Sequence, residues 1–303
     1  MDPLSDVLSL LKPRSSISAG LDTGGDWAIR FPAPDGIKFN AVMRGACWVM
    51  VEGDPEPQWL EEGDCFLLTR ARPFILAKDL SLDPIDSGPI YEAAKDGIAT
   101  CNGGGEFFLI GGRFSFAGEH ARLLFDALPA IVHVREQSSQ ASVLRWALDQ
   151  LARELNTGQP GGFLISEHLA QIMLVQVLRL YLAAKGTVGV GWFHALADRQ
   201  LSRAVGAMHT DPAYRWTLTE LARVAGMSRS TFAQRFKQVV GASPMDYLMR
   251  WRMLVAGNKL RNSNESISAI AISLGYESES AFSTAFKRVM ACSPRQFQRQ
   301  SAA

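Results

Sequence analysis

The chain of 303 residues has few cysteines, four in all, and its apolar and charged fractions are those of an ordinary globular protein. No uncharged apolar run reaches the length that is needed to cross a membrane. The N-terminus has the pattern of a short amphipathic helix that stops before Pro13, and it lacks the basic region and the cleavage site of a secretion signal. We therefore expect a cytoplasmic protein of about two domains, with no membrane partner and with reduced cysteines.

The net charge of +1 conceals a division between the two parts of the sequence. Residues 1–197 carry 16 Lys and Arg against 23 Asp and Glu, whereas residues 198–303 carry 15 against 7, a net charge of +8. Contacts of Lys and Arg with phosphates supply most of the non-specific affinity for nucleic acids. The basic C-terminal part suits a polyanionic partner such as DNA. The charge alone does not distinguish DNA binding from an ordinary basic surface, so other features must decide.

Two helix-turn-helix patterns follow one another in this basic part. Five positions recur at an offset of fifty residues, namely Phe232, Phe236, Ser243, Pro244 and Tyr247 in the first copy and Phe282, Phe286, Ser293, Pro294 and Phe297 in the second. Gly226 and Gly275 lie in the two turns at an offset of forty-nine, so the second turn is one residue longer. Two such units on one chain are suited to two successive major grooves of DNA.

The ends of the helices are marked by local signals. Thr217 and Glu220 have the spacing of a capping box, and Ser228 and Ser278 are placed to cap the two recognition helices. Pro244 follows a Ser cap and opens a long apolar helix. We expect this helix to tie the two units together and to fix the spacing of the recognition helices.

The segments LTELARVAGMSRSTFAQRFKQVVGASPMDYL and ISAIAISLGYESESAFSTAFKRVMACSPRQF resemble the AraC/XylS family of bacterial transcription regulators. The resemblance covers roughly residues 198–299. It implies a seven-helix domain that binds double-stranded DNA in adjacent major grooves, about 34 Å apart. It also implies a homodimer and RNA polymerase as a partner in transcription regulation.

Each recognition helix presents short polar side chains with cations at the edges, the composition that a major-groove helix needs. The outward face of the first helix consists of Arg229, Ser230, Ala233, Gln234 and Lys237. That of the second consists of Glu279, Ser280, Ser283, Thr284, Lys287 and Arg288. The resemblance assigns the base contacts to Ser230, Ala233 and Gln234 in one helix and to Ser280, Ser283 and Thr284 in the other.

The chemistry of these side chains predicts unequal roles. Gln234 can pair bidentately with adenine and Ala233 can pack on a thymine methyl, so the first helix should carry more sequence information. Glu279 lies in the first turn of its helix, where a carboxylate complements the helix dipole, and we favour this role over a contact with cytosine. The cations at the edges are expected to contact phosphates or solvent.

From about Ser16 to Ala117 the sequence changes to short apolar runs separated by Gly, Pro and Asp, the pattern of a β-sandwich or barrel. The candidate strands are Trp27–Phe31, Lys38–Met43, Cys47–Val51, Cys65–Leu68, Phe74–Ala77, Glu106–Ile110 and Arg113–Phe116, with a turn expected at Gly111-Gly112. GACWVMVEG and LEEGDCFLLTRARPFIL resemble the cupin-like sensor domain of AraC-type regulators. The expected fold class is α+β and multidomain: a cupin-like barrel, a helical connector and an all-α tandem helix-turn-helix domain.

Cupin enzymes hold a metal with histidines on two of these strands. The five histidines of this chain all lie outside residues 38–77, so we expect neither a catalytic metal nor another cofactor. A cupin-type enzyme with a DNA-binding tail is therefore the weaker alternative. The barrel is predicted to bind a small-molecule effector, with Trp48, Met50, Phe66 and Arg72 as candidate lining residues whose orientation depends on strand register.

Two cysteines, Cys47 and Cys65, lie on predicted strands. We expect them to act as small hydrophobic residues, and a redox sensor is the alternative because Arg44, Arg70 and Arg72 lie near them in the sequence.

Residues 140–156 and 162–185 are helical by pattern. The second helix is apolar over more than one face, so we expect it to form a dimer interface that includes Ile172 and Leu178. The expected domains are a sensor at 1–125, the connector at 126–190 and the DNA-binding domain at 195–303. A short joint at 186–191 separates the last two. The predicted function is a sequence-specific, ligand-controlled transcription regulator.

Overall fold

The computed structural model describes residues 2–11, 13–54, 56–95, 97–116, 128–135, 142–157, 159–185 and 190–302. The chain divides into two compact units, and each is described by itself. We call one the cupin unit, after the family that its sequence resembles; its described residues lie within 13–116 and 128–184. We call the other the DNA-binding unit, after the function that the resemblance implies; its described residues lie within 2–11 and 185–302.

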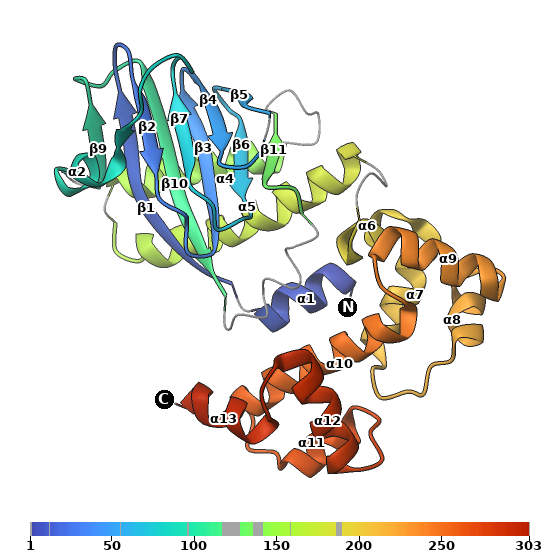
Figure 1. Cartoon of the computed structure of the whole chain (residues 1–303). Helices are drawn as coiled ribbons and strands as arrows, with labels where there is room; N and C mark the ends of the chain where they lie inside the picture. Colours follow the sequence, from blue (N-terminus) through green and yellow to red (C-terminus); the bar gives the residue numbers. More distant parts are fainter. Residues whose placement is uncertain are drawn as a thin grey trace. The chain divides into compact units, whose positions relative to one another are not determined.

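The cupin unit is a sandwich of two sheets (Figure 1). The larger sheet has the strand order β11-β6-β3-β10-β1-β9, with bounds Ile131–Val134, Cys65–Leu68, Ile37–Arg44, Phe107–Ser115, Arg14–Thr23 and Ile98–Cys101. The smaller sheet has the order β5-β4-β7-β2-β8, with bounds Gln58–Glu61, Ala46–Val51, Phe74–Ala77, Ala28–Phe31 and Ile85–Asp86. A short helix α2, Ser87–Glu92, follows β8. The sheet-rich fold expected from the sequence is confirmed.

The expected turn at Gly111-Gly112 is wrong, because both glycines lie inside the nine-residue strand β10. Gly111 pairs with Asn40 and Gly112 with Phe39 on the neighbouring strand β3. A Cβ at Gly111 would lie 2.9 Å from Oδ1 of Asn40, so the glycine is required by a close side chain and not by a turn. The strands β1, β5, β8, β9 and β11 were not expected, since they are short, polar or glycine-containing.

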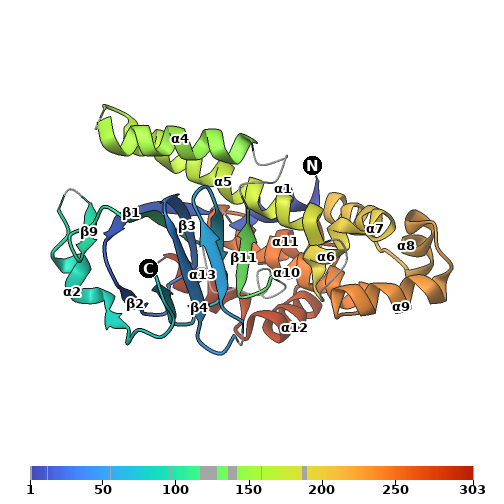
Figure 2. The same ribbon diagram turned by 90° about the horizontal axis from the view of Figure 1, so that it is seen from above.

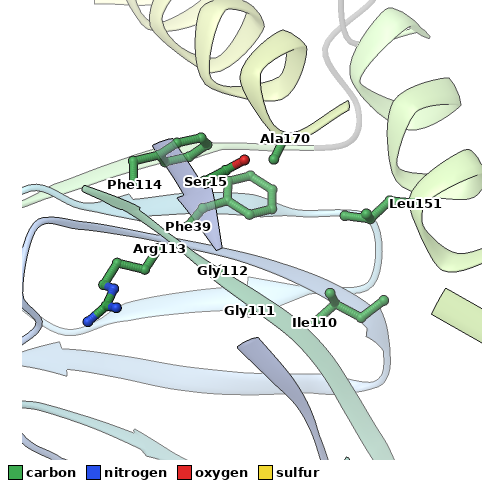
Figure 3. Close-up of a pocket in the computed structure, with 9 residues that line it drawn as sticks. All are labelled: Ser15, Phe39, Ile110, Gly111, Gly112, Arg113, Phe114, Leu151 and Ala170. Carbon is green, nitrogen blue, oxygen red and sulfur yellow. The ribbon is translucent and has the colours of Figure 1, made fainter. Parts of the chain in front are cut away.

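Two helices cover the outer face of the larger sheet, α4 at Ser142–Thr157 and α5 at Gly162–Lys185 (Figure 2). A small cavity of about 10 Å³ remains between them and the sheet, with room for about one water molecule (Figure 3). The helix α5 is the one described helix whose length and apolarity could span a membrane, and 44% of its apolar window is buried within the protein. Part of the apolar surface of α5 is therefore buried by packing on the sheet.

The effector-lining residues expected from the sequence do not share one surface. Cys47, Val49 and Val51 of β4 point into the sandwich, so Trp48 and Met50 point outward, and their expected place inside the barrel is wrong. The alternation of side chains along a strand makes this a difference of one residue in register. Arg72 is exposed, and Phe66 is a fully buried member of the apolar core between the sheets.

Both cysteines that the sequence singled out are fully buried, and Cys47 belongs to the core between the sheets. Burial raises the pKa of the Cys47 and Cys65 thiols far above the ordinary value, which favours the protonated form. This environment is the opposite of that of a reactive thiolate, and it supports the role of small hydrophobic residues.

The DNA-binding unit contains the seven helices that the family resemblance implies. They are α7 at Arg199–Thr210, α8 at Leu218–Ala225, α9 at Arg229–Val240, α10 at Pro244–Asn262, α11 at Ile267–Ser273, α12 at Glu279–Met290 and α13 at Pro294–Ala302. A preceding helix, α6 at Trp192–Ala197, packs on α7 and α9. The expected start of the DNA-binding domain at residue 195 falls inside α6. Residues 186–189 of the expected joint lie outside the described part of the chain.

The N-terminal helix α1, Pro3–Leu11, belongs to the DNA-binding unit. From the sequence we had expected it in the sensor. Its buried residues Leu4, Val7 and Leu11 form one stripe, and the helix contacts α6, α7 and α10. The amphipathic pattern was recognised in the sequence, but a pattern does not tell which core receives the apolar stripe.

Beneath α1 lies a buried aromatic stack centred on His209. The imidazole lies 3.6 Å from the Trp251 ring, centroid to centroid, and its Nε2 is 2.7 Å from the Tyr247 hydroxyl. Asp6 of α1 lies 3.7 Å from Nδ1, but burial lowers the pKa of His209 to about 3. The histidine is therefore neutral at pH 7, and the contact with Asp6 is not an ion pair there.

The depressed pKa of His209 predicts acid sensitivity. The unfolded chain binds a proton at the ordinary pKa of 6.5, whereas the folded chain does not until about pH 3. Stability is thus full above pH 6.5 and decreases as the pH falls toward 3. The free energy of unfolding should fall by about 2 kcal/mol between pH 7 and pH 5 from this group alone. Urea titrations of the wild type and of His209→Gln measure it, and an equal pH dependence in both would contradict the assignment.

The end of α12 predicts a stabilising substitution. Ala291 adopts a left-handed backbone conformation with φ of 58°, and the equivalent position fifty residues earlier is Gly241 with φ of 77°. The left-handed conformation costs a residue with a Cβ about 1 kcal/mol relative to glycine. Ala291→Gly should raise the free energy of unfolding by about that amount, measured by urea denaturation. Gly241→Ala is the matched control and should lower it, and opposite signs would contradict the strain.

Candidate nucleic-acid interface

The first helix-turn-helix unit has the local structure that its sequence predicts. Thr217 and Glu220 form a capping box at the start of α8, with Thr217 Oγ1 accepting from the Glu220 amide and Glu220 Oε2 accepting from the Thr217 amide. Gly226 ends α8 in a left-handed conformation. Ser228 then caps α9 by accepting from the Thr231 amide. These contacts set the angle at which α9 leaves the turn.

The second unit repeats the arrangement with a longer turn. Gly275 has φ of 79°, and Ser278 caps α12 by accepting from the amide of Ala281. A Cβ on Gly275 would lie 2.2 Å from the carbonyl oxygen of Ala213, in the loop before α8. The glycine therefore permits both the left-handed turn and a close approach of the two units.

Each recognition helix buries its aromatic residues and leaves the predicted DNA face outward. Phe232 and Phe236 are fully buried on α9, as are Phe282 and Phe286 on α12. The expected contact residues are exposed except for Ala233 and Ser283, which are half-buried; the exposed ones are Arg229, Ser230, Gln234, Lys237, Glu279, Ser280, Thr284, Lys287 and Arg288. The two faces thus lie at equivalent positions of the two repeats.

Some of these side chains have partners within their own unit. The Thr284 hydroxyl donates to the carbonyl of Ser280 at 3.0 Å, and Ser230 shares a hydroxyl contact of 3.2 Å with the cap Ser228. Glu279 lies 4.0 Å from Arg295, which fits the structural role favoured for it. Arg288 contacts the sulfur of Met249. Gln234 has an exposed amide in the middle of its helix, so the first helix retains the side chain with the most specific hydrogen-bonding pattern.

The long helix α10 connects the two units through both of their cores. Tyr247 packs on Phe236 of the first unit, with ring centroids 5.8 Å apart. Met253 and Leu260 belong to the apolar cluster of the second unit. Between them, Arg252 donates to the carbonyls of Pro212 at 2.6 Å and Tyr214 at 2.9 Å. The helix and this arginine fix the two recognition helices in one body.

A basic hollow at the start of α7 was not found from the sequence. It is lined by Ala197, Asp198, Arg199, Gln200, Arg203 and Arg235. Asp198 caps α7, and its Oδ2 lies 2.6 Å from the guanidinium of Arg235 on the recognition helix α9. The signal in the sequence was the spacing of Arg199 and Arg203, which places both on one face of α7.

Family models and relatives agree with this architecture. A cupin family model matches residues 2–183, and a helix-turn-helix domain model matches residues 221–300. Putative AraC-like transcription regulators of Streptomyces antibioticus and Streptomyces lividans are 48% and 49% identical over 299 residues, which is 99% of this chain and 99% and 98% of theirs. The transcriptional regulator AlkR of Acinetobacter baylyi is 30% identical over 99% of this chain and all of its own.

Solved structures match the chain with low TM-scores. The DNA-binding domain of AdpA in complex with a target DNA is 28% identical and covers 33% of this chain and 90% of its own, with a TM-score of 0.32. ToxT of Vibrio cholerae covers 94% of this chain and 95% of its own at 12% identity, with a TM-score of 0.39. The full-length matches, together with the two family models, show that the chain belongs to the AraC-type family of DNA-binding transcription regulators with an N-terminal cupin domain.

Proposed function

We propose that this regulator is a cytoplasmic homodimer that binds its operator through α9 and α12, with Ser230, Ala233 and Gln234 on the first helix and Ser280, Ser283 and Thr284 on the second facing the bases. The observation that carries this proposal is the equivalent exposure of the two faces on helices that α10 holds in one body. The relatives are named as regulators and not as enzymes, which favours regulation over cupin-type catalysis.

The cations around the two faces are assigned to the DNA backbone. Lys237, Lys287 and Arg288 lie at the edges of the recognition helices and are exposed. Arg199 and Arg203 of the basic hollow are also exposed, on the helix that precedes the first unit. Contacts with phosphates position a protein on DNA without distinguishing sequences. These cations should therefore contribute affinity and salt dependence, whereas Gln234 contributes sequence preference.

Dimerisation is assigned to the outer face of α4 and α5. Six large apolar side chains of these two helices are exposed and do not pack into the core of the unit: Val143, Trp146, Phe163, Leu164, Ile165 and Ile172. The exposed fractions of Trp146 and Phe163 are 52% and 78%. Leu178, which the sequence placed at the interface, is instead buried at 1% exposure within the cupin unit. Exposed apolar side chains in this number are characteristic of an interaction surface.

The cupin unit is the proposed sensor, in which a small molecule alters the affinity of the dimer for DNA. The bound dimer then acts on transcription through RNA polymerase. The tandem units supply the DNA contacts in this scheme, and the cupin unit supplies the dimer contacts and the signal. DNA binding and dimerisation are thus assigned to different surfaces of the two units. Each function can therefore be tested by substitutions that leave the surface for the other unchanged.

The base contact of Gln234 gives the first test of this scheme. Gln234→Ala should relax the preference at one base pair and weaken specific binding about tenfold, since a bidentate contact contributes about 1–3 kcal/mol. Selection of binding sites from random DNA, followed by titration at fixed salt, measures both effects.

Lys237→Ala is the matched control on the same helix. It should weaken binding to all sequences alike and reduce the slope of log affinity against log salt by about 1, with an unchanged site preference. An unchanged preference in Gln234→Ala as well would remove Gln234 from the base contacts.

The proposed interface predicts that Ile172→Glu and Trp146→Glu separate the dimer. Burial of an unpaired carboxylate costs several kcal/mol, enough to dissociate a typical dimer. Light scattering at constant concentration measures the mass, and operator affinity should fall by about a hundredfold as the tethering of two subunits is lost. Leu80→Glu introduces the same charge at an exposed apolar residue of a loop in the cupin unit and should remain dimeric. Dimers with wild-type affinity in all three variants would place the interface elsewhere.

A further inference from the structure

The turn of the second helix-turn-helix unit is one residue longer than that of the first. One residue, Met227, separates the turn glycine from the serine cap in the first unit, whereas two residues, Tyr276 and Glu277, separate them in the second. Both of these residues contact side chains outside their own turn. The ring of Tyr276 lies 5.8 Å from the guanidinium of Arg252 on α10, and Glu277 pairs with Arg215 in the first unit. The longer turn is thus used in the connection between the two units.

The loop between α7 and α8, residues 211–217, is held in one shape by its own side chains. Asp211 accepts from the amide of Tyr214 at 3.1 Å, and the indole of Trp216 donates to the carbonyl of Asp211 at 3.0 Å. The rings of Tyr214 and Trp216 pack edge to face, with centroids 4.7 Å apart. The Tyr214 hydroxyl also donates to Glu220 of α8 at 2.8 Å. The loop is therefore joined firmly to the first unit.

This loop contacts the second unit and α10 in three ways. The guanidinium of Arg215 lies 2.6 Å from the Glu277 carboxylate. The backbones of the loop and the second turn approach so closely that a Cβ on Gly275 would lie 2.2 Å from the carbonyl oxygen of Ala213. Arg252 of α10 donates to two carbonyls of the loop. The first unit therefore touches the second turn directly as well as through α10.

A direct contact restricts movements that a connecting helix permits. Long helices bend along their length, so a single helix allows the units at its two ends to swing relative to each other. A contact away from that helix opposes the swing. Because α9 follows the first turn and α12 follows the second, the contact holds the two recognition helices at one distance and angle. One added base pair changes the separation of two DNA sites by about 3.4 Å and their relative rotation by about 35°.

We propose that the loop 211–217 and the turn 274–278 form a brace that selects the distance between the two half-sites, with Arg215 and Glu277 as its positioning residues. The inference rests on the proposed function, because it requires α9 and α12 to bind DNA together. It adds that the preference for one spacing depends on this contact and not on α10 alone. The side chains of Arg215 and Glu277 are 73% and 76% exposed, so each can be replaced without opening a core.

The measured quantity is the spacing ratio. It is the affinity of the full-length protein for an operator with the native half-site spacing, divided by its affinity for the same operator with one base pair inserted between the half-sites. Selection from random DNA supplies the operator, and titrations at fixed salt supply the affinities. Arg215→Ala and Glu277→Ala should each lower the ratio about threefold, since an exposed ion pair changes an equilibrium constant only a few-fold. Affinity for DNA with the first half-site alone should not change.

Exchange of the two charges separates positioning from a contact with DNA. The double variant Arg215→Glu, Glu277→Arg keeps the ion pair in reversed order and should restore the ratio. If Arg215 contacted a phosphate, Arg215→Ala would weaken binding to all three DNAs alike, and the exchange would not restore it. That result would overturn the brace. Arg30→Ala removes an exposed ion pair with Glu52 in the cupin unit, and this control should have the wild-type ratio.

Substitution of the two turn glycines tests the close approach. Gly275→Ala places a Cβ against the Ala213 carbonyl, so the units must move apart and the ratio should fall further than in Arg215→Ala. Gly226→Ala is the matched control, because its φ of 66° is also left-handed but the nearest atom to its Cβ is 3.9 Å away. Both variants should be less stable in urea, and only Gly275→Ala should change the ratio. Equal ratios in the two would overturn the close approach as part of the brace. The charge variants decide if Gly275→Ala does not fold.

The wild type tests the proposed function separately. Equal affinity for both spacings would overturn the simultaneous binding of α9 and α12, and the brace with it. A wild type that prefers the native spacing, with the same ratio in Arg215→Ala, Glu277→Ala and Gly275→Ala, would overturn the brace and leave the DNA-binding function standing. A lower ratio in these variants, restored by the charge exchange, supports both.

Discussion

The fixed connection between the two helix-turn-helix units is the constraint on which the DNA-binding half depends. The helix α10 contributes Tyr247 to one core and Met253 and Leu260 to the other, so neither unit can rotate without exposing apolar surface. Arg252 further restricts movement of one unit against the other, because it is hydrogen-bonded to the loop before α8 and Gly275 of the second unit packs on that loop. Two recognition helices in one rigid body can occupy adjacent grooves only at one spacing. Selectivity therefore includes the distance between half-sites as well as the bases contacted.

The sequence predicted this half well because its signals are local. The Thr217 and Glu220 capping box, the turn glycines and the serine caps each depend on residues within one helical turn, and all are present as expected. The repeat added a second copy of every signal. The sequence did not predict the placement of α1 or the pairing of Asp198 with Arg235. Both depend on contacts between residues more than thirty positions apart in the sequence, which no local pattern encodes.

The cupin half was predicted only as a class of fold, because strand patterns carry weaker information. The side chains of β4 alternate with a period of two, so an error of one residue exchanged Trp48 and Met50 for Cys47 and Val49 inside the sandwich. Gly111 and Gly112 have the composition of a turn but lie in the middle of β10, because a neighbouring side chain occupies the space that a Cβ would need. Both errors concern which face a residue occupies, and only pairing with neighbouring strands decides it.

Two buried polar residues, His209 and Asn40, illustrate how burial is used differently in the two units. His209 is stacked on Trp251, and its Nε2 is bonded to the Tyr247 hydroxyl. Its depressed pKa keeps it neutral, and its Nδ1 has no hydrogen-bond partner among the described residues. Asn40 is fully buried, and neither polar atom of its side chain has a hydrogen-bond partner in the described part of the chain. A residue whose only role was packing could be replaced by leucine at no cost, since the amide loses its bonds to water and gains none. The structure therefore tolerates a destabilising group at Asn40, on the same strand as Lys38, whose pKa burial lowers to about 8.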